Sequence, residues 1–204
     1  MTSDSLHLPS AARIVALHDG LFAITGWPLQ QPAAADDGLW QWVQANHRFN
    51  SLLWAEEDLA RRTTVADAEI AANKRAIDGY NQRRNDAIER IDETLLARLA
   101  DVRPVDNAWH NSETAGAMID RLSILSLKRF HMDAQTQRKD ASDAHLATCR
   151  EKLARLDVQR ADLARCLETL LAASARGGAF WRIYRQFKMY NDPTLNPYLY
   201  ANKT

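Results

Sequence analysis

The sequence predicts an all-α protein: an elongated helical bundle of about four long helices, with a short N-terminal helix and an aromatic C-terminal wrap. Three observations support this class. The six prolines leave residues 33–103 and 105–192 free of proline, so long helices can run there without a broken hydrogen-bond ladder. Apolar residues recur at helical spacing within both stretches. Alternating Val/Ile/Thr runs and hairpin dipeptides such as Asn-Gly, which mark strands, are absent from the sequence.

The chain begins with a short helix and a loop. Residues 10–17 are expected to be helical, and Gly20–Gly38, with Trp27 and two prolines, is typical of a loop. We expect this region to cover one end of the bundle. Residues 1–204 are interpreted as a single helical domain, in which 1–38 form a cap and loop, 39–176 the long-helix bundle and 177–204 the wrap.

Two long helices are predicted next, over residues 39–62 and 67–100. The first has an apolar stripe with a polar row along one edge, made of Asn46, Asn50, Glu57 and Arg61. The second has an apolar seam of 3–4 spacing, typical of coiled coils, whose middle third turns polar.

The helix predicted over residues 112–137 organises the fold. It has apolar residues on almost every side and is therefore expected at the centre of the bundle. Glu113, Asp120 and His131 fall in one narrow sector of the helical wheel, which predicts a buried polar row that needs partners. Ala115 and Gly116 would let another backbone approach closely.

The last long helix is predicted over residues 140–176, with a leucine seam interrupted by Arg160. Gly177-Gly178 is expected to end it. Cys149 and Cys166 lie about 25 Å apart along this helix, so they are not expected to form a disulfide, and a reducing cytoplasm is favoured. The tail interleaves aromatic and basic residues, which favours core packing over the stacking of single-stranded nucleic acid.

Composition excludes several classes of function. The formal net charge is zero, with 26 basic and 26 acidic residues, so a nucleic-acid partner is not expected. The spacing of Arg138 and His145 resembles an element of helical ribonucleases, but a solvated pair is favoured. No secretory signal and no run of about 18 apolar residues is present, so neither secretion nor a membrane span is expected, and the predicted location is cytoplasmic.

Four ordered segments carry a resemblance. They are LLWAEEDLARR, IAANKRAIDGYNQRRNDAIERID, ETAGAMIDRLSILSLKRFHM and QFKMYNDPTLNPYL, within the region from about Asn46 to Tyr200. They are similar to the bacterial domain of unknown function 4254 family. The resemblance implies a bacterial, all-helical protein with no established activity, associated with cell-envelope polysaccharide biosynthesis. The chain departs from the family pattern at Ala115, where a proline is expected after Glu-Thr.

The resemblance also implies a set of motif positions in this chain. They are Glu57, Asp58, Arg61, Lys74, Asn81, Asn85, Asp86, Glu113, Asp120, Arg121, His131, Lys188, Asn191, Asp192 and Asn196. Several of them also belong to the polar rows found from helical spacing. The candidate ligand-binding residues in the polar interior are Asn50, Glu57, Arg61, Lys74, Asn81, Asn85, Glu113, Asp120, Arg121 and His131.

The chemistry of these residues allows more than one interpretation. A cationic, amide-lined pocket for a phosphate or carboxylate would form if Lys74, Asn81, Arg84, Asn85, Arg121, Lys128 and Arg160 converged. A closed structural network of salt bridges and hydrogen bonds is favoured over such a pocket. No metal and no cofactor is predicted, because the Glu-x-x-His pairs of helical di-metal sites are absent and Glu113 lies about 10 Å from Asp120 along the axis.

Two functions therefore stay open. The first is a non-catalytic interaction or regulatory protein in cell-envelope polysaccharide biosynthesis, with a protein partner or a homodimer formed through the long helices. The second is an enzyme or ligand-binding protein whose polar interior takes a phosphorylated or sugar-nucleotide ligand. An open pocket among the polar groups would favour the second, and a closed network the first.

Overall fold

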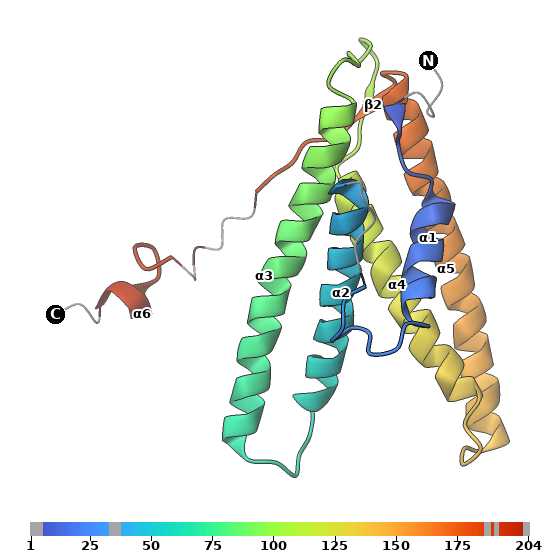
Figure 1. The fold of residues 1–204 in the computed structure, drawn as a ribbon, viewed down its shortest axis with the longest axis vertical. Coiled ribbons are helices and arrows are strands. Elements are labelled where there is room, and N and C mark those ends of the chain that lie inside the picture. The colour runs from blue at the N-terminus through green and yellow to red at the C-terminus, as the bar shows by residue number, and fades with distance from the viewer. Residues whose placement is uncertain (1–5, 33–37, 186–188, 190–191, 202–204) are drawn as a thin grey trace.

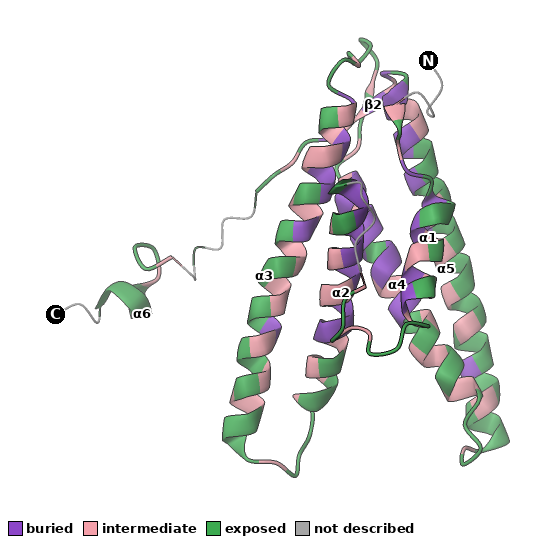
Figure 2. Ribbon diagram, viewed as in Figure 1, coloured by how far each residue is buried: buried purple, intermediate pink, exposed green. Residues whose placement is uncertain are grey.

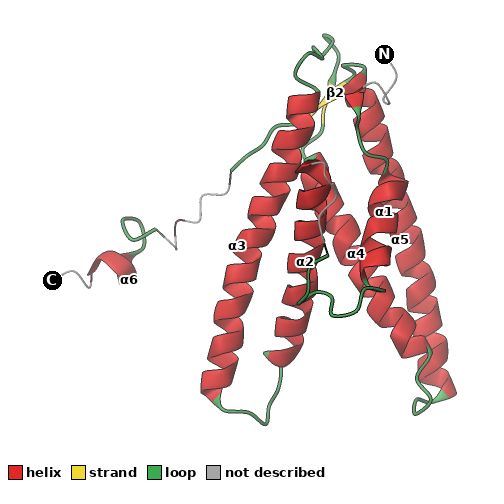
Figure 3. Cartoon of the chain, in the orientation of Figure 1, coloured by secondary structure: helices red, strands yellow, loops and turns green. Residues whose placement is uncertain are grey.

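The computed structural model describes residues 6–32, 38–185, 189 and 192–201, and over this part of the chain the structure is almost entirely helical (Figure 3). The helices are α1 (Ala11–Leu21), α2 (Gly38–Leu59), α3 (Asp67–Arg98), α4 (Ala115–Thr136), α5 (Asp143–Ala175) and the short α6 (Pro197–Tyr200). Two strands of two residues each, β1 (Trp109–His110) and β2 (Ala179–Phe180), complete the elements. The predicted all-α class is confirmed.

Side chains in the sequence set where three of these helices begin. Ser10, Thr114 and Ser142 each accept a hydrogen bond from the backbone N–H three residues later and so cap α1, α4 and α5. Gly177 follows α5 with φ 73°, a conformation that costs glycine little, and a Cβ there would lie 2.4 Å from the Arg103 carbonyl oxygen. The predicted end of this helix is confirmed.

The long helices form two antiparallel hairpins, α2–α3 and α4–α5, which diverge from the end of the molecule that holds β2 (Figure 1). Helix α4 contacts α1, α2, α3 and α5, as expected for a central helix. Buried residues gather where the hairpins converge, and the outer faces and far ends of α3 and α5 are exposed (Figure 2). The core is therefore concentrated toward one end of an A-shaped molecule.

The two strands tie the α3–α4 connection to the end of α5. They pair in parallel, Trp109 with Ala179 and His110 with Phe180. The backbone N–H of Trp109 donates to the Gly178 carbonyl oxygen at 2.9 Å. No sequence pattern predicted this pair, because two residues are too few to show alternation.

Three sequence expectations need correction. Helix α1 lies along the side of the bundle against α4 and α5, with Ile14 and His18 fully buried, and does not cover an end. Phe130 is one of the apolar residues for which the helix over 112–137 was expected to be surrounded by the bundle, but its side chain is 45% exposed and stacks on Phe22. The tail does not wrap the bundle over its described residues: Trp181 joins the core, but residues 192–201 lie away from the bundle (Figure 1).

The described helices include none that is long and apolar enough to cross a membrane. Both cysteines are free, Cys149 buried and Cys166 exposed, as expected from their separation.

Candidate functional site

Two adjoining hollows lie where α2 faces the α4–α5 hairpin. The first, the Asn50 hollow, has a volume of about 310 Å³ and is lined by Asn50, Leu53, Trp54, Glu57, Asp58, Arg61, Arg84, Ile124 and Leu127. The second, the cationic hollow, has a volume of about 490 Å³ and is lined by Trp54, Asp58, Lys128, His131, Met132, Gln135, Lys152, Arg155, Leu156 and Gln159. Trp54 and Asp58 line both, so the hollows form one continuous surface.

A closed polar network lies beneath the Asn50 hollow. Asp120 Oδ1 accepts a hydrogen bond from Asn46 Nδ2 and another from Asn50 Nδ2, each at 2.8 Å. Asn50 Nδ2 also donates to Ser123 Oγ at 2.9 Å. Arg84 Nε lies 3.9 Å from the same Asp120 oxygen. The network thus fixes the Asn50 amide that lines the hollow, whereas Arg84 Nε has only this charge contact and no hydrogen bond among the described residues.

The network continues into a buried histidine pair. His47 Nδ1 lies 2.9 Å from Ser123 Oγ, and the His47 ring stacks on His18 with ring centroids 4.6 Å apart. Burial lowers the pKa of His47 to about 3 and that of His18 well below the usual range, so both rings are neutral at pH 7. The pair therefore packs as part of the core and adds no charge to the hollows.

Acid–base pairs fill the mouth of the Asn50 hollow. Arg61 Nη1 donates to Glu57 Oε2 at 2.8 Å, and Lys74 Nζ lies 3.9 Å from the same oxygen. The side chains of Arg61 and Lys74 are both more than half exposed, so these pairs add little stability. The charges at this end largely cancel.

The cationic hollow has a different balance of positive and negative side chains. Lys128 of α4 and Lys152 and Arg155 of α5 face one acid, Asp58 of α2. Within the described part of the chain neither lysine forms an ion pair, and the pair that Arg155 forms with Glu151 spans 3.7 Å between two exposed side chains. An anionic group entering this hollow would meet cations that no strong internal partner neutralises.

One wall of the cationic hollow is aromatic. The rings of Trp54 and His131 stack with centroids 4.4 Å apart and planes 3° from parallel. Burial lowers the pKa of His131, and the nearby Asp58 charge opposes that shift. A neutral imidazole on an indole gives the hollow a flat apolar wall opposite its charges, which suits a ligand with both a charged and an apolar part.

The comparison with known families gives one match. Residues 40–183 match the family described as Protein of unknown function (DUF4254). The chain belongs to this family. No curated protein and no solved structure matched the chain. The match covers all of the residues that line the two hollows of this DUF4254 protein.

The structure brings together only part of the predicted site. Asn50, Glu57, Arg61 and His131 line the two hollows, with Asp120 beneath them and Lys74 against Glu57. Asn81 and Asn85 are half-buried on α3, where Asn85 lines another hollow beside Tyr184. Lys188 and Asn191, which the family resemblance added, lie outside the described residues.

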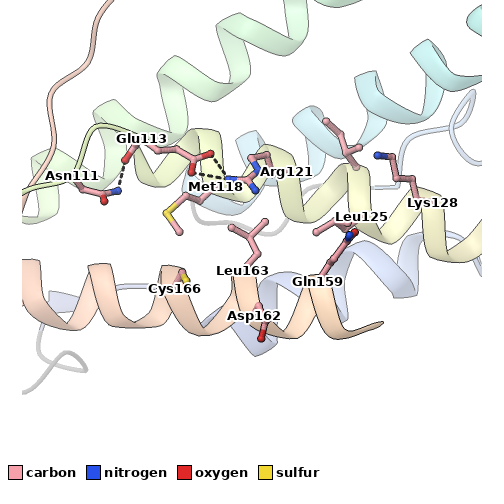
Figure 4. A pocket seen from close by; sticks show the side chains of 11 residues that line it. Asn111, Glu113, Met118, Arg121, Leu125, Lys128, Gln159, Asp162, Leu163 and Cys166 are labelled. Atoms are coloured by element: carbon pink, nitrogen blue, oxygen red, sulfur yellow. Dashed lines mark hydrogen bonds and ion pairs between the residues drawn. The ribbon is translucent and has the colours of Figure 1, made fainter. Parts of the chain in front are cut away.

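Glu113 and Arg121 belong to a third hollow. This Glu113 hollow, about 800 Å³ between α4 and α5, is lined by Asn111, Glu113, Met118, Arg121, Ile124, Leu125, Lys128, Gln159, Asp162, Leu163 and Cys166 (Figure 4). Arg121 Nη1 donates to both carboxylate oxygens of Glu113, at 3.0 and 2.8 Å.

The expected row of Glu113, Asp120 and His131 is therefore wrong. Glu113 precedes the first residue of α4 and pairs with Arg121 at the surface, Asp120 is buried against α2, and His131 stacks on Trp54. Residues that share a sector of a helical wheel can still lie far apart along the helix axis. Each of these three side chains therefore meets a different neighbour.

The single cationic pocket that was the less favoured alternative for α3, α4 and α5 does not form from these residues. Arg84 pairs with Asp120, Arg121 with Glu113, and Arg160 donates to Asp19 at 2.7 Å. Each of these guanidinium groups pairs with a different acid, because α3 packs mainly on α2 whereas α5 packs mainly on α4.

Sequence reasoning missed Trp54, Lys152 and Arg155. Trp54 follows Asn50 by four residues, and Asp58 and Arg61 continue the same helical face, so this part could have been found from spacing. Lys152 and Arg155 sit among many charges of a polar helix and give no such signal. Within the described residues, no group of three or more His, Cys, Asp or Glu is close enough to hold a metal ion.

Proposed function

We propose that this DUF4254 protein binds a phosphorylated small molecule in the cationic hollow. The observation that carries the proposal is the surplus of positive charge: Lys128, Lys152 and Arg155 line a hollow whose one acid is Asp58. The stacked Trp54 and His131 rings supply the apolar wall that ligand sites combine with a few polar groups.

The polar network beneath serves as a support for this site. Asp120 holds the Asn50 amide at 2.8 Å, and Asn50 reaches the neighbouring hollow that shares Trp54 and Asp58. A ligand that extends into the Asn50 hollow therefore meets an amide whose position is fixed before it arrives, which lowers the entropy cost of that contact. A sugar nucleotide, with its diphosphate and flat base, belongs to the chemical class that these two hollows suit.

Thermal unfolding with an anion panel tests the proposal. Inorganic phosphate, pyrophosphate and uridine diphosphate are added to the whole protein. A ligand at 100 times its Kd adds about 2.7 kcal/mol, which should raise Tm by about 5 to 10 °C for a chain of this length. Lys152→Ala should abolish most of the rise, and the exposed Lys139→Ala, in the loop between α4 and α5, should keep it.

Two outcomes would count against this proposal. One is the absence of a rise with any member of the panel. The other is an equal rise in Lys152→Ala, Lys128→Ala and the Lys139→Ala control.

A second candidate function is an interaction or regulatory protein that binds a protein partner or a second copy through its long helices. It is supported by a largely apolar hollow of about 520 Å³ between α1 and α5, lined by Ala12, Val15, Ala161 and Ala164 among others, close in sequence to the exposed Val158. For either function we propose a cytoplasmic role associated with cell-envelope polysaccharide biosynthesis. If none of the anions in the panel raises Tm, this second candidate is favoured.

A further inference from the structure

The groove that holds the proposed anion site continues along the α4–α5 seam. Lys128 and Gln159 line both the cationic hollow and the Glu113 hollow, so the two share a wall. From Lys128 to Met118 the Glu113 hollow extends about 15 Å along α4, at 1.5 Å per residue. A ligand with its charged group near Lys128 would have room for a second part in the Glu113 hollow.

The charge of this second part can be inferred from the lining. The negative charges of Glu113 and Asp162 equal in number the positive charges of Arg121 and Lys128 in this lining. Arg121 Nη1 already donates to both oxygens of Glu113, and Asp162 pairs with Arg165. A second anionic group would gain little from the occupied arginine and would face two carboxylates, so the part that fits here is neutral.

The remaining lining points to a group rich in hydroxyls. Met118, Leu125 and Leu163 form an apolar floor between the helices, with the amide of Gln159 at its edge beside Leu125 (Figure 4). Asp162 also lines the hollow, although its carboxylate points away from Leu163 in this view. Carboxylates accept hydrogen bonds from hydroxyl groups, amides both donate and accept, and an apolar floor packs against the C–H face of a sugar ring. A purely apolar group would offer no partner to the Gln159 amide or to the Asp162 oxygen that Arg165 does not contact.

We propose that the Glu113 hollow is a subsite for a polyhydroxy, carbohydrate-like group attached to the phosphate that the cationic hollow holds. This inference rests on the proposed function, and it narrows the ligand from any phosphorylated small molecule to a glycosyl phosphate. Gln159 and Asp162 are the side chains that recognise its hydroxyls.

Calorimetry on the whole protein tests the subsite, with inorganic phosphate compared with the 1-phosphates of glucose, galactose and N-acetylglucosamine. At least one glycosyl phosphate should bind tenfold or more tightly than phosphate. Asp162→Asn, which keeps the size of the side chain, should remove most of that gain and leave phosphate binding unchanged. Asp133→Asn, an exposed change on α4 outside both hollows, should leave both affinities unchanged.

Cys166 gives an independent readout, because it is exposed and lines the Glu113 hollow, whereas Cys149 is buried. The glycosyl phosphate that binds best should slow the alkylation of Cys166 by N-ethylmaleimide severalfold, and phosphate alone should not. Mass spectrometry separates the two cysteines.

The outcomes distinguish the two proposals. If phosphate or pyrophosphate binds but no glycosyl phosphate binds more tightly or protects Cys166, the subsite is refuted and the anion site stands. If neither phosphate, pyrophosphate nor any glycosyl phosphate binds, the proposed function is refuted and the subsite with it. The subsite is also refuted if the Asp162→Asn variant still binds the glycosyl phosphate more tightly than phosphate by the same factor as the wild type.

Discussion

At the scale of single residues, Asp120 is the centre of the polar interior. It is 7% exposed and accepts hydrogen bonds from two asparagines of α2, while Arg84 of α3 supplies the nearest positive charge. Asp120→Asn keeps one acceptor oxygen but removes the charge opposite Arg84 and places an N–H group where the second carboxylate oxygen lay. We expect the free energy of unfolding to fall by about 1 to 3 kcal/mol, the usual range for losing a charged partner in a buried site.

Urea denaturation of the variant and the wild type measures this change. Asp133→Asn on the same helix is the matched control, since Asp133 is exposed and accepts a hydrogen bond from Gln137 at the surface. An Asp120→Asn protein as stable as the wild type would show that the network does not stabilise the fold.

Sequence reasoning found the residues of this network that share a helix and failed where contact depends on packing. Asn46, Asn50, Glu57 and Arg61 were placed on one edge of α2 because helical spacing fixes which side chains are neighbours. The partners of Asn46 and Asn50, which are Asp120 and Ser123, lie seventy or more residues away, and which of the polar groups on α4 would meet them depends on the rotation and offset of two helices. Helical spacing does not contain that information.

At the scale of elements, one glycine sets how closely α3 approaches α4. The backbone N–H of Gly116 donates to Asp92 Oδ1 at 2.7 Å, and a Cβ at Gly116 would lie 2.6 Å from the Ile88 carbonyl oxygen and 2.7 Å from Asp92 Oδ2. Gly116→Ala gains up to about 1 kcal/mol of helix propensity but must separate the two helices. We expect a net loss of about 1 to 3 kcal/mol in the free energy of unfolding.

Gly79 provides the contrasting substitution. It lies in the middle of α3, is exposed, and would have no atom within 4 Å of an added Cβ. Gly79→Ala should therefore raise the free energy of unfolding, by up to about 1 kcal/mol. If thermal or urea unfolding shows Gly116→Ala to be as well tolerated as Gly79→Ala, the close contact between α3 and α4 is not a constraint on the fold.

The sequence predicted the helices themselves to within a few residues, because caps, glycines and apolar spacing are local signals. The central helix was expected over residues 112–137 and spans Ala115–Thr136. The close approach at Gly116 was expected from its small side chain, although the partner, α3, was not. The parallel pair β1–β2 went unforeseen since it joins segments about seventy residues apart.

At the scale of the whole molecule, a buried polar cluster joins α1 to both hairpins. His18 of α1 stacks on His47 of α2, His47 lies 2.9 Å from Ser123 of α4, and Arg160 of α5 donates to Asp19 of α1. The four long helices and the central position of α4 were predictable from sequence, whereas the short α6 was not. The divergence of the two hairpins, and therefore the groove between them, depends on how this junction packs.

The junction makes the stability of the molecule depend on pH. Burial lowers the pKa of His47 to about 3 and that of His18 well below 6.5, with the Arg160 charge adding to the effect on His18. As the pH falls below 6.5, the unfolded chain binds two protons that the folded protein excludes, so the folded state loses stability. Asp92 acts in the opposite direction: burial raises its pKa to about 6, so between pH 6 and 3.8 the folded state binds a proton that the unfolded chain does not.

Two histidines outweigh one aspartate, and each group contributes about 1.4 kcal/mol per pH unit while it titrates. We therefore expect the free energy of unfolding to fall by roughly 1.4 kcal/mol per unit between pH 6 and pH 4. His18→Phe keeps a stacking ring and loses no hydrogen bond of the His18 ring, whose nitrogens have no partner among the described residues. Urea denaturation at a series of pH values should show a slope shallower than that of the wild type by about 1.4 kcal/mol per pH unit for this variant in that interval, and the exposed His145→Gln should retain the wild-type slope. If His18→Phe and the wild type lose stability equally on acidification, the buried histidine pair is not what makes the junction sensitive to acid.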